Sequence, residues 1–228
     1  MKVSALLTIS FVLLTIMGTL MHEMGHIVPA KLLGYETTLH YGSMSWERKS
    51  LIYSNQLFRK YTEKAKVPQL ELDKLDILKE REIEHGLWIS LGGPIQTMLT
   101  GFLGMLILYI RRDTFKTNEF DFLDWIGVFL AFFWSRQIFK LFTGTLSFLL
   151  GNASSPFGGD EAKISTSLNL HAGTIGIITG LISVIVCSYV VFKVVPRRYR
   201  VKFMIFGLLG SIGGYILWFY VLGPALLP

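Results

Sequence analysis

Two histidines and a glutamate interrupt an apolar segment near the start of the chain, in the stretch HEMGH at residues 22–26. Residues four apart lie one turn apart on one face of an α-helix, so His22 and His26 can present two imidazole nitrogens to one ion. Glu23 stands beside the first histidine, where a carboxylate reaches a water at the metal rather than the metal. Zinc lowers the pKa of such a water, and the carboxylate can take its proton. The pattern predicts a zinc hydrolase with Glu23 as general base.

A third metal ligand must come from elsewhere in the chain, because catalytic zinc sites usually hold three protein ligands. The single cysteine, Cys187, lies in an apolar stretch, which excludes a cysteine-based site. Asp160, in the glycine-rich turn SPFGGDEAKIS, is the first candidate, and its neighbour Glu161 competes with it. The remaining alternatives are His85, His171 and His40.

The composition predicts that these residues belong to a membrane protein. The 228 residues are 51% hydrophobic and only 17% charged, which is too apolar for an ordinary soluble domain. Stretches of about twenty apolar residues, enough to cross a hydrocarbon core of about 30 Å, occupy residues 3–21, 87–110, 123–150, 171–195 and 203–222. We expect an all-α, multi-pass integral protein of the cell membrane with about five transmembrane helices.

The one sizeable polar region, residues 35–86, lies between the first two apolar stretches. Its start, ETTLHYGSMSW, predicts a short β-hairpin. Its end, QLELDKLDILKEREIEHG, predicts an amphipathic helix that leads into the second span. If all five stretches cross the membrane, the end of the first and the turn that carries Asp160 share one side, so this turn can reach back toward His22 and His26.

Basic residues give the chain a formal net charge of +6, and they gather at the ends of the apolar stretches. This distribution indicates contact with the lipid bilayer and no nucleic-acid partner. Arg136 and Lys140 instead interrupt the third stretch, where a charged side chain must face protein or water unless the helix is broken. We expect Arg136 to pair with an acidic residue and Lys140 to extend to the membrane surface. The alternative is that Arg136 lines a cleft or contacts a substrate carboxylate.

Three motifs together resemble the landmarks of the site-2 protease family of intramembrane zinc metalloproteases. They are HEMGH in the first apolar segment, SLGGPIQTMLTG opening the second and FGGDEAKIS after the third. The resemblance implies that His22, His26 and Asp160 bind Zn²⁺ and that Glu23 is the general base. It covers residues 3 to about 167, which implies a metalloprotease core at 1–170, including the 35–86 insertion, and two additional helices at 171–228.

The chain departs from the family pattern in two motifs. Thr97, with Gln96 beside it, stands where the family usually has an asparagine after its Gly-Pro, and we expect one of the two to contact the substrate backbone. The third motif reads Asp160-Glu161 rather than Asp-Gly. The family often carries a re-entrant hairpin after its first helix, and the hairpin expected here would align an unwound substrate by strand addition.

These patterns predict an intramembrane zinc endopeptidase that hydrolyses a peptide bond in or near a transmembrane segment of another membrane protein. The alternative is a non-proteolytic membrane scaffold or transporter that retains a protease-like fold. The intact Glu23 argues against that alternative, because losing it is the simplest route to inactivity. The side of the membrane on which the site lies stays open, since the distribution of basic residues and the family resemblance favour opposite orientations.

Overall fold

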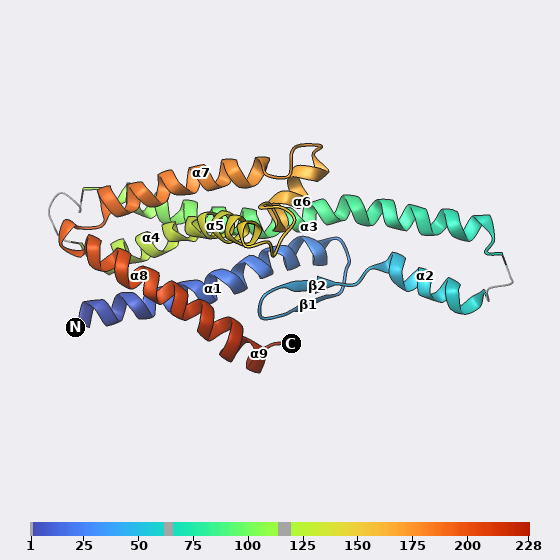
Figure 1. Cartoon of the computed structure of the whole chain (residues 1–228), viewed down its shortest axis with the longest axis horizontal. Coiled ribbons are helices and arrows are strands. Elements are labelled where there is room, and N and C mark those ends of the chain that lie inside the picture. Colours follow the sequence, from blue (N-terminus) through green and yellow to red (C-terminus); the bar gives the residue numbers. More distant parts are fainter. Residues whose placement is uncertain (1, 62–65, 114–119) are drawn as a thin grey trace.

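The computed structural model describes residues 2–61, 66–113 and 120–228, which form an elongated helical bundle with one small hairpin (Figure 1). Within these described ranges, five helical segments are long and apolar enough to cross a membrane, and each contains most of one predicted stretch. The helices are α1 (Lys2–Leu32), α2 (Lys49–Lys60), α3 (Gln69–Ile110), α4 (Phe122–Ala131), α5 (Ser135–Leu149), α6 (Gly159–Ser167), α7 (Thr174–Tyr189), α8 (Arg197–Leu217) and α9 (Gly223–Leu226). The strands are β1 (Thr37–Leu39) and β2 (Met44–Trp46).

Helix α1 is longer than its apolar stretch. It has 31 residues and continues through the HEMGH motif and past Pro29. The motif therefore lies inside a helix, where its two histidines share one face as the spacing requires. The short β-hairpin predicted after the first apolar stretch is confirmed, because β1 and β2 pair antiparallel with Thr38 opposite Ser45.

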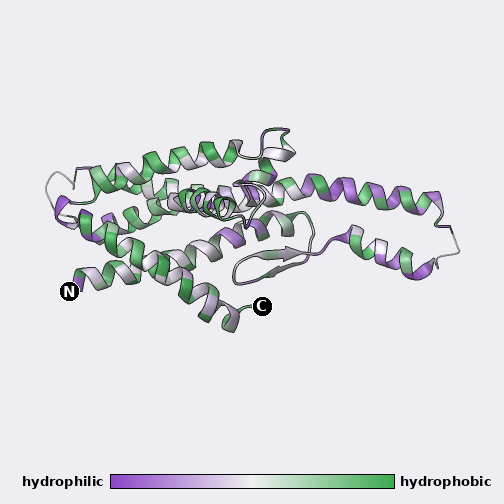
Figure 2. Ribbon diagram, viewed as in Figure 1, coloured by the Kyte–Doolittle hydropathy of each residue, from purple (hydrophilic) through white to green (hydrophobic). Residues whose placement is uncertain are grey.

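Helix α3 joins the predicted amphipathic helix and the second span into one continuous helix of 42 residues. At a rise of 1.5 Å per residue it is about 63 Å long, roughly twice the thickness of a hydrocarbon core. Its N-terminal half mixes hydrophilic and hydrophobic residues and extends beyond the apolar bundle (Figure 2). Helix α2, which we did not predict, runs beside this extension, and its Ser50 binds Glu82 through backbone and hydroxyl at 2.9 and 2.6 Å.

The third predicted span is broken near its middle. Helix α4 ends at Ala131, a 3₁₀ turn covers Phe132–Trp134, and α5 begins at Ser135 in a clearly different direction (Figure 1). This break places Arg136 in the first turn of α5, at an interruption in the span rather than at the middle of a straight transmembrane helix.

Helix α8 packs along α1 through small residues. An added Cβ at Gly210 would lie 2.5 Å from the backbone oxygen of Thr8, so the two backbones are in near contact. Such glycine faces let membrane helices approach closely. The phenyl rings of Phe11 and Phe203 pack edge to face beside this contact, 5.0 Å apart. The boundary proposed at residue 170 stays a prediction, although α8 lies directly against the first helix.

Candidate metal centre

A close approach of two helices brings the histidines of α1 against α3. An added Cβ at Gly25 would lie 2.7 Å from the oxygen of Gly92, and one at Gly92 would lie 2.1 Å from the oxygen of Gly25. Because neither residue has a side chain, the backbones meet directly at the turn of α1 that carries the motif. This contact sets the position of His22 and His26 relative to α3.

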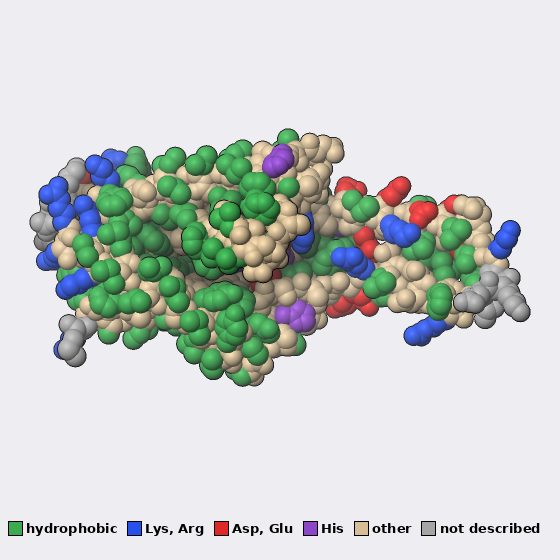
Figure 3. Space-filling model, in the orientation of Figure 1, with side chains coloured by type: hydrophobic (Ala, Val, Ile, Leu, Met, Phe, Trp, Pro, Cys, Tyr) green, Lys and Arg blue, Asp and Glu red, His purple; other side chains and the backbone are tan. Residues whose placement is uncertain are grey.

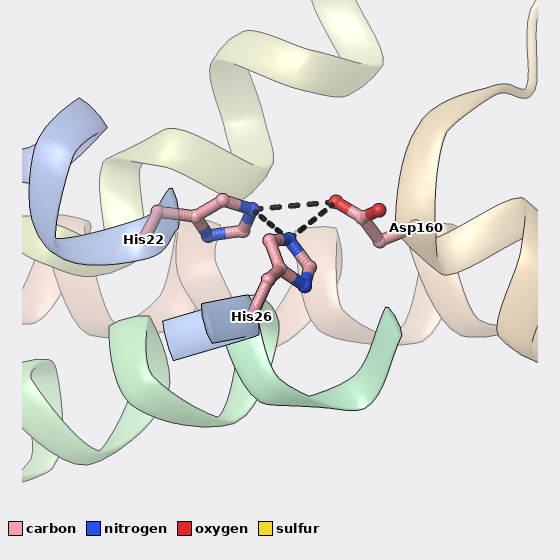
Figure 4. A group of neighbouring side chains, drawn as sticks. All are labelled: His22, His26 and Asp160. Atoms are coloured by element: carbon pink, nitrogen blue, oxygen red, sulfur yellow. Dashed lines mark hydrogen bonds and ion pairs between the residues drawn. The ribbon is translucent and has the colours of Figure 1, made fainter. Parts of the chain in front are cut away.

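Three potential ligand atoms converge at this contact (Figure 4). Nε2 of His22 and Nε2 of His26 lie 3.3 Å apart, and Oδ2 of Asp160 lies 3.3 Å from each of them. Asp160 comes from the first turn of α6, more than 130 residues along the chain. Among the residues that the structure describes, these three form the one group of His, Cys, Asp or Glu side chains able to hold a metal ion.

Hydrogen bonds on the far side of each ring leave Nε2 free to bind a cation. The Thr97 hydroxyl donates to the Gly93 carbonyl at 3.0 Å, so it accepts the Nδ1–H of His22 at 2.9 Å. Nδ1 of His26 donates to the Ile89 carbonyl at 2.6 Å; the Gly93 N–H is farther from this nitrogen, at 3.3 Å. Such outer partners are typical of metal-binding histidines, because they fix tautomer and ring orientation.

The spacing of the three atoms fits zinc. A tetrahedral ion with bonds of about 2.0–2.1 Å holds its ligand atoms about 3.3–3.4 Å apart, which matches the three separations. With both Nδ1 atoms protonated, two imidazole nitrogens and a carboxylate oxygen face one another, an arrangement that a metal ion or a shared proton would stabilise. Gly93 leaves room beside them, since an added Cβ would lie 2.3 Å from Nε2 of His26 and 2.7 Å from Nε2 of His22.

Asp160 is held in place by a glycine and a lysine. Gly159 has φ +72°, which favours glycine, and an added Cβ there would lie 2.6 Å from Nζ of Lys140. Burial alone would raise the pKa of the Asp160 carboxyl, but the contacts with the two imidazoles and the charge of Lys140 outweigh that effect and hold the pKa below its ordinary range. Asp160 is therefore a carboxylate at neutral pH.

The other candidate ligands have different partners. Glu161 is buried beside Asp160, but its Oε2 accepts a hydrogen bond from Lys140 at 2.9 Å. His85 is hydrogen-bonded to the hydroxyl of Tyr35 at 2.8 Å. His40 and His171 are also absent from the group of three ligands. The geometry thus favours Asp160 over every alternative that the sequence left open.

A cavity of about 750 Å³ opens beside the three ligand atoms. Glu23, His26 and Asp160 line one part of it, and Met44 and Trp46 of β2 line another. Glu23 itself is buried, at 7% exposure. The cavity therefore connects the proposed general base with the strand that we expected to align a substrate.

Our expectation for Arg136 was wrong, and the expectation that Lys140 extends to the membrane surface stays a prediction. The Nζ atom of Lys140 contacts Glu161 at 2.9 Å and Asp160 at 3.4 Å. Arg136 has no carboxylate oxygen within 4.0 Å among the described residues, and it lines the cavity, which is the alternative reading. The sequence did contain a sign of a shared site, because Arg136 and Lys140 are four residues apart inside an apolar stretch and so lie on one face of a helix.

The two residues expected to contact substrate have other places in the structure. Thr97 is only 1% exposed and supports His22. Gln96 donates from Nε2 to the hydroxyl of Thr100 at 3.0 Å. Neither Gln96 nor Thr97 lines the cavity. Substrate contact stays a prediction for both, and the geometry indicates that Thr97 orients His22.

Comparison of the chain with protein-family models, with curated proteins and with solved structures found no match.

Proposed function

We propose that the chain is an integral membrane zinc endopeptidase that cleaves another membrane protein in or near a transmembrane segment. The observation that carries the proposal is the converging triad of His22, His26 and Asp160, with Glu23 beside it on a cavity. The motif resemblance to the site-2 protease family points to the same chemistry.

The surface of the bundle supports placement in a membrane. Large apolar side chains are exposed on helices that form its outside, among them Leu6 (66%), Leu99 (62%) and Leu208 (64%). Figure 3 shows apolar side chains over the bundle, basic ones at one end and mixed charges on the extension formed by α2 and α3. An apolar band of this extent suits lipid rather than water. The cell membrane is the location that we propose.

The residues of the site have separate roles in the proposed hydrolysis. His22, His26 and Asp160 would hold zinc, which when bound lowers the pKa of water and polarises a carbonyl. Glu23 is adjacent in sequence to His22 and lines the cavity, so its carboxylate can accept a proton from the attacking water and donate it to the leaving nitrogen. Thr97 and Lys140 keep the ligands in position through the bonds described above.

The hairpin supports a peptide as the substrate. The hydrogen bond from the His40 N–H to the Ser43 carbonyl turns the backbone of Ser43 toward β1. Backbone direction alternates along a strand, so Met44 and Trp46 direct their backbone groups to the open edge of β2. Both residues line the cavity. An unwound transmembrane segment can satisfy its backbone there, which it must do before its peptide bonds are open to attack.

Cleavage by purified protein tests this proposal. The wild type and Glu23→Gln are reconstituted with zinc and incubated with labelled single-span membrane proteins, and the products are identified by mass spectrometry. We expect cleavage by the wild type, loss of at least about 100-fold in Glu23→Gln and equal zinc content in both. Glu84→Gln, an exposed site on α3, is the matched control and should cleave normally.

Two results would contradict the proposal. Cleavage by Glu23→Gln at the wild-type rate would show that Glu23 is not the base. A wild type that binds zinc but cleaves none of the substrates would favour the non-proteolytic scaffold or transporter.

A further inference from the structure

Arg136 is a cation inside the third predicted span that the proposed mechanism does not yet use. It lies in the first turn of α5 and lines the cavity together with Glu23, His26 and Asp160. Its Nε is buried, and no hydrogen-bond partner for it exists among the described residues. A buried guanidinium nitrogen without a partner is costly and calls for a functional explanation.

The carboxylates around Arg136 form no ion pair with it, and two of them bind other side chains. Its charge interacts with those of Glu23, Glu161 and Asp160, but none of these forms an ion pair with it. Asp160 faces the two histidines and Glu161 binds Lys140. Glu23 is the proposed base. The guanidinium is therefore a positive charge beside the proposed reacting groups that forms no ion pair among the described residues.

Peptide hydrolysis creates a negative charge that suits this position. When the water oxygen bonds to the carbonyl carbon, the π electron pair of the C=O bond moves onto the carbonyl oxygen, and one proton of the water passes to Glu23. The pair then returns as the C–N bond breaks, and Glu23 gives its proton to the departing nitrogen. An oxygen that is charged only between these two events is stabilised most by a cation already in place.

We propose that Arg136 is a further catalytic residue, whose guanidinium binds this carbonyl oxygen while it is negatively charged; the inference rests on the proposed endopeptidase function. Arg136 lines the cavity and has no ion pair among the residues that the structure describes, so the side chain can do this without breaking such a pair. Its contribution is specific to the transition state, because a neutral carbonyl oxygen interacts much less with a cation.

Arg136→Gln and Arg136→Lys test the inference against Arg197→Gln, which removes a charge from an exposed arginine at the start of α8. Zinc content, kcat and KM are measured on a substrate that the wild type cleaves, together with the inhibition constant of a phosphinic analogue of that cleavage site. We expect Arg136→Gln to lower kcat by about 10²–10³-fold with zinc content and KM unchanged. The inhibition constant should rise by the same factor as kcat/KM falls. Arg136→Lys should lose less, and Arg197→Gln should match the wild type.

Three results would overturn the inference alone. One is a wild-type kcat in Arg136→Gln. Another is a rise in KM confined to substrates with acidic residues while the phosphinic analogue binds normally, which would make Arg136 a receptor for a substrate carboxylate. The third is loss of zinc from both Arg136 variants, which would make the residue structural. Absence of cleavage by the wild type would instead overturn the proposed function, and this inference with it.

Discussion

Gly93→Ala tests whether the metal ligands are as closely surrounded as the structure shows. The new Cβ would lie 2.3 Å from Nε2 of His26 and 2.7 Å from Nε2 of His22, whereas real Cβ atoms essentially never come closer than 3.0 Å. Relief of these contacts requires the His26 nitrogen to withdraw by about 0.7 Å and the His22 nitrogen by about 0.3 Å. Metal bond lengths tolerate only about 0.2 Å of change. At least the His26 bond should therefore be lost.

The expected result is zinc affinity at least about 100-fold weaker in Gly93→Ala, which corresponds to roughly 2.7 kcal/mol of binding free energy. The assay is competition between the purified protein and a chromophoric zinc chelator. Gly86→Ala is the matched control on the same helix, because an added Cβ there meets nothing within 4 Å. It should bind zinc like the wild type. Equal zinc affinity in Gly93→Ala and Gly86→Ala would refute the geometry described here.

Three further predictions concern other parts of the site and fold. Thr97→Val removes the acceptor for Nδ1–H of His22, so zinc affinity should fall about 10- to 100-fold in the same competition assay while Thr97→Ser retains it. Trp218→Phe removes the 2.6 Å hydrogen bond to the Tyr41 carbonyl, so amides of the hairpin should exchange faster with deuterium. The hydrogen bond from the backbone N–H of Asp124, and after it the charge of Arg111, lower the pKa of Asp121. The Asp121 carboxylate therefore stabilises the fold above about pH 4, and this stabilisation is lost as the pH falls through the lowered pKa. In an acid unfolding experiment, Asp121→Asn should lack this pH-dependent loss of stability.

Local patterns in the sequence identified most of the site. The four-residue spacing of His22 and His26 depends only on helix geometry, so it is readable from the chain. Asp160 was the first candidate because a glycine-rich turn after the third span lies on the same side as the end of the first. The hairpin followed from β-branched residues around a Gly-Ser pair. The identity of the metal, the reaction and the substrate remain proposals.

Contacts between segments far apart in the chain could not be predicted from the sequence. Thr97 lies 75 residues from His22, and their hydrogen bond exists only because Gly25 and Gly92 bring α1 and α3 together. The bond from Lys140 to Asp160 likewise depends on the break after α4, which composition does not reveal. Helix α1 runs past its apolar stretch because backbone hydrogen bonds continue through polar residues once neighbouring helices cover them.

Zinc K-edge X-ray absorption of the purified, zinc-loaded protein tests the central claim most directly. If His22, His26 and Asp160 hold the ion, the spectrum should show nitrogen and oxygen neighbours at about 2.0–2.1 Å with the multiple scattering of two imidazoles. Asp160→Ala should retain the imidazole signature but lose zinc affinity. A wild type that binds no zinc at one equivalent, or a spectrum without two imidazoles, would contradict the account.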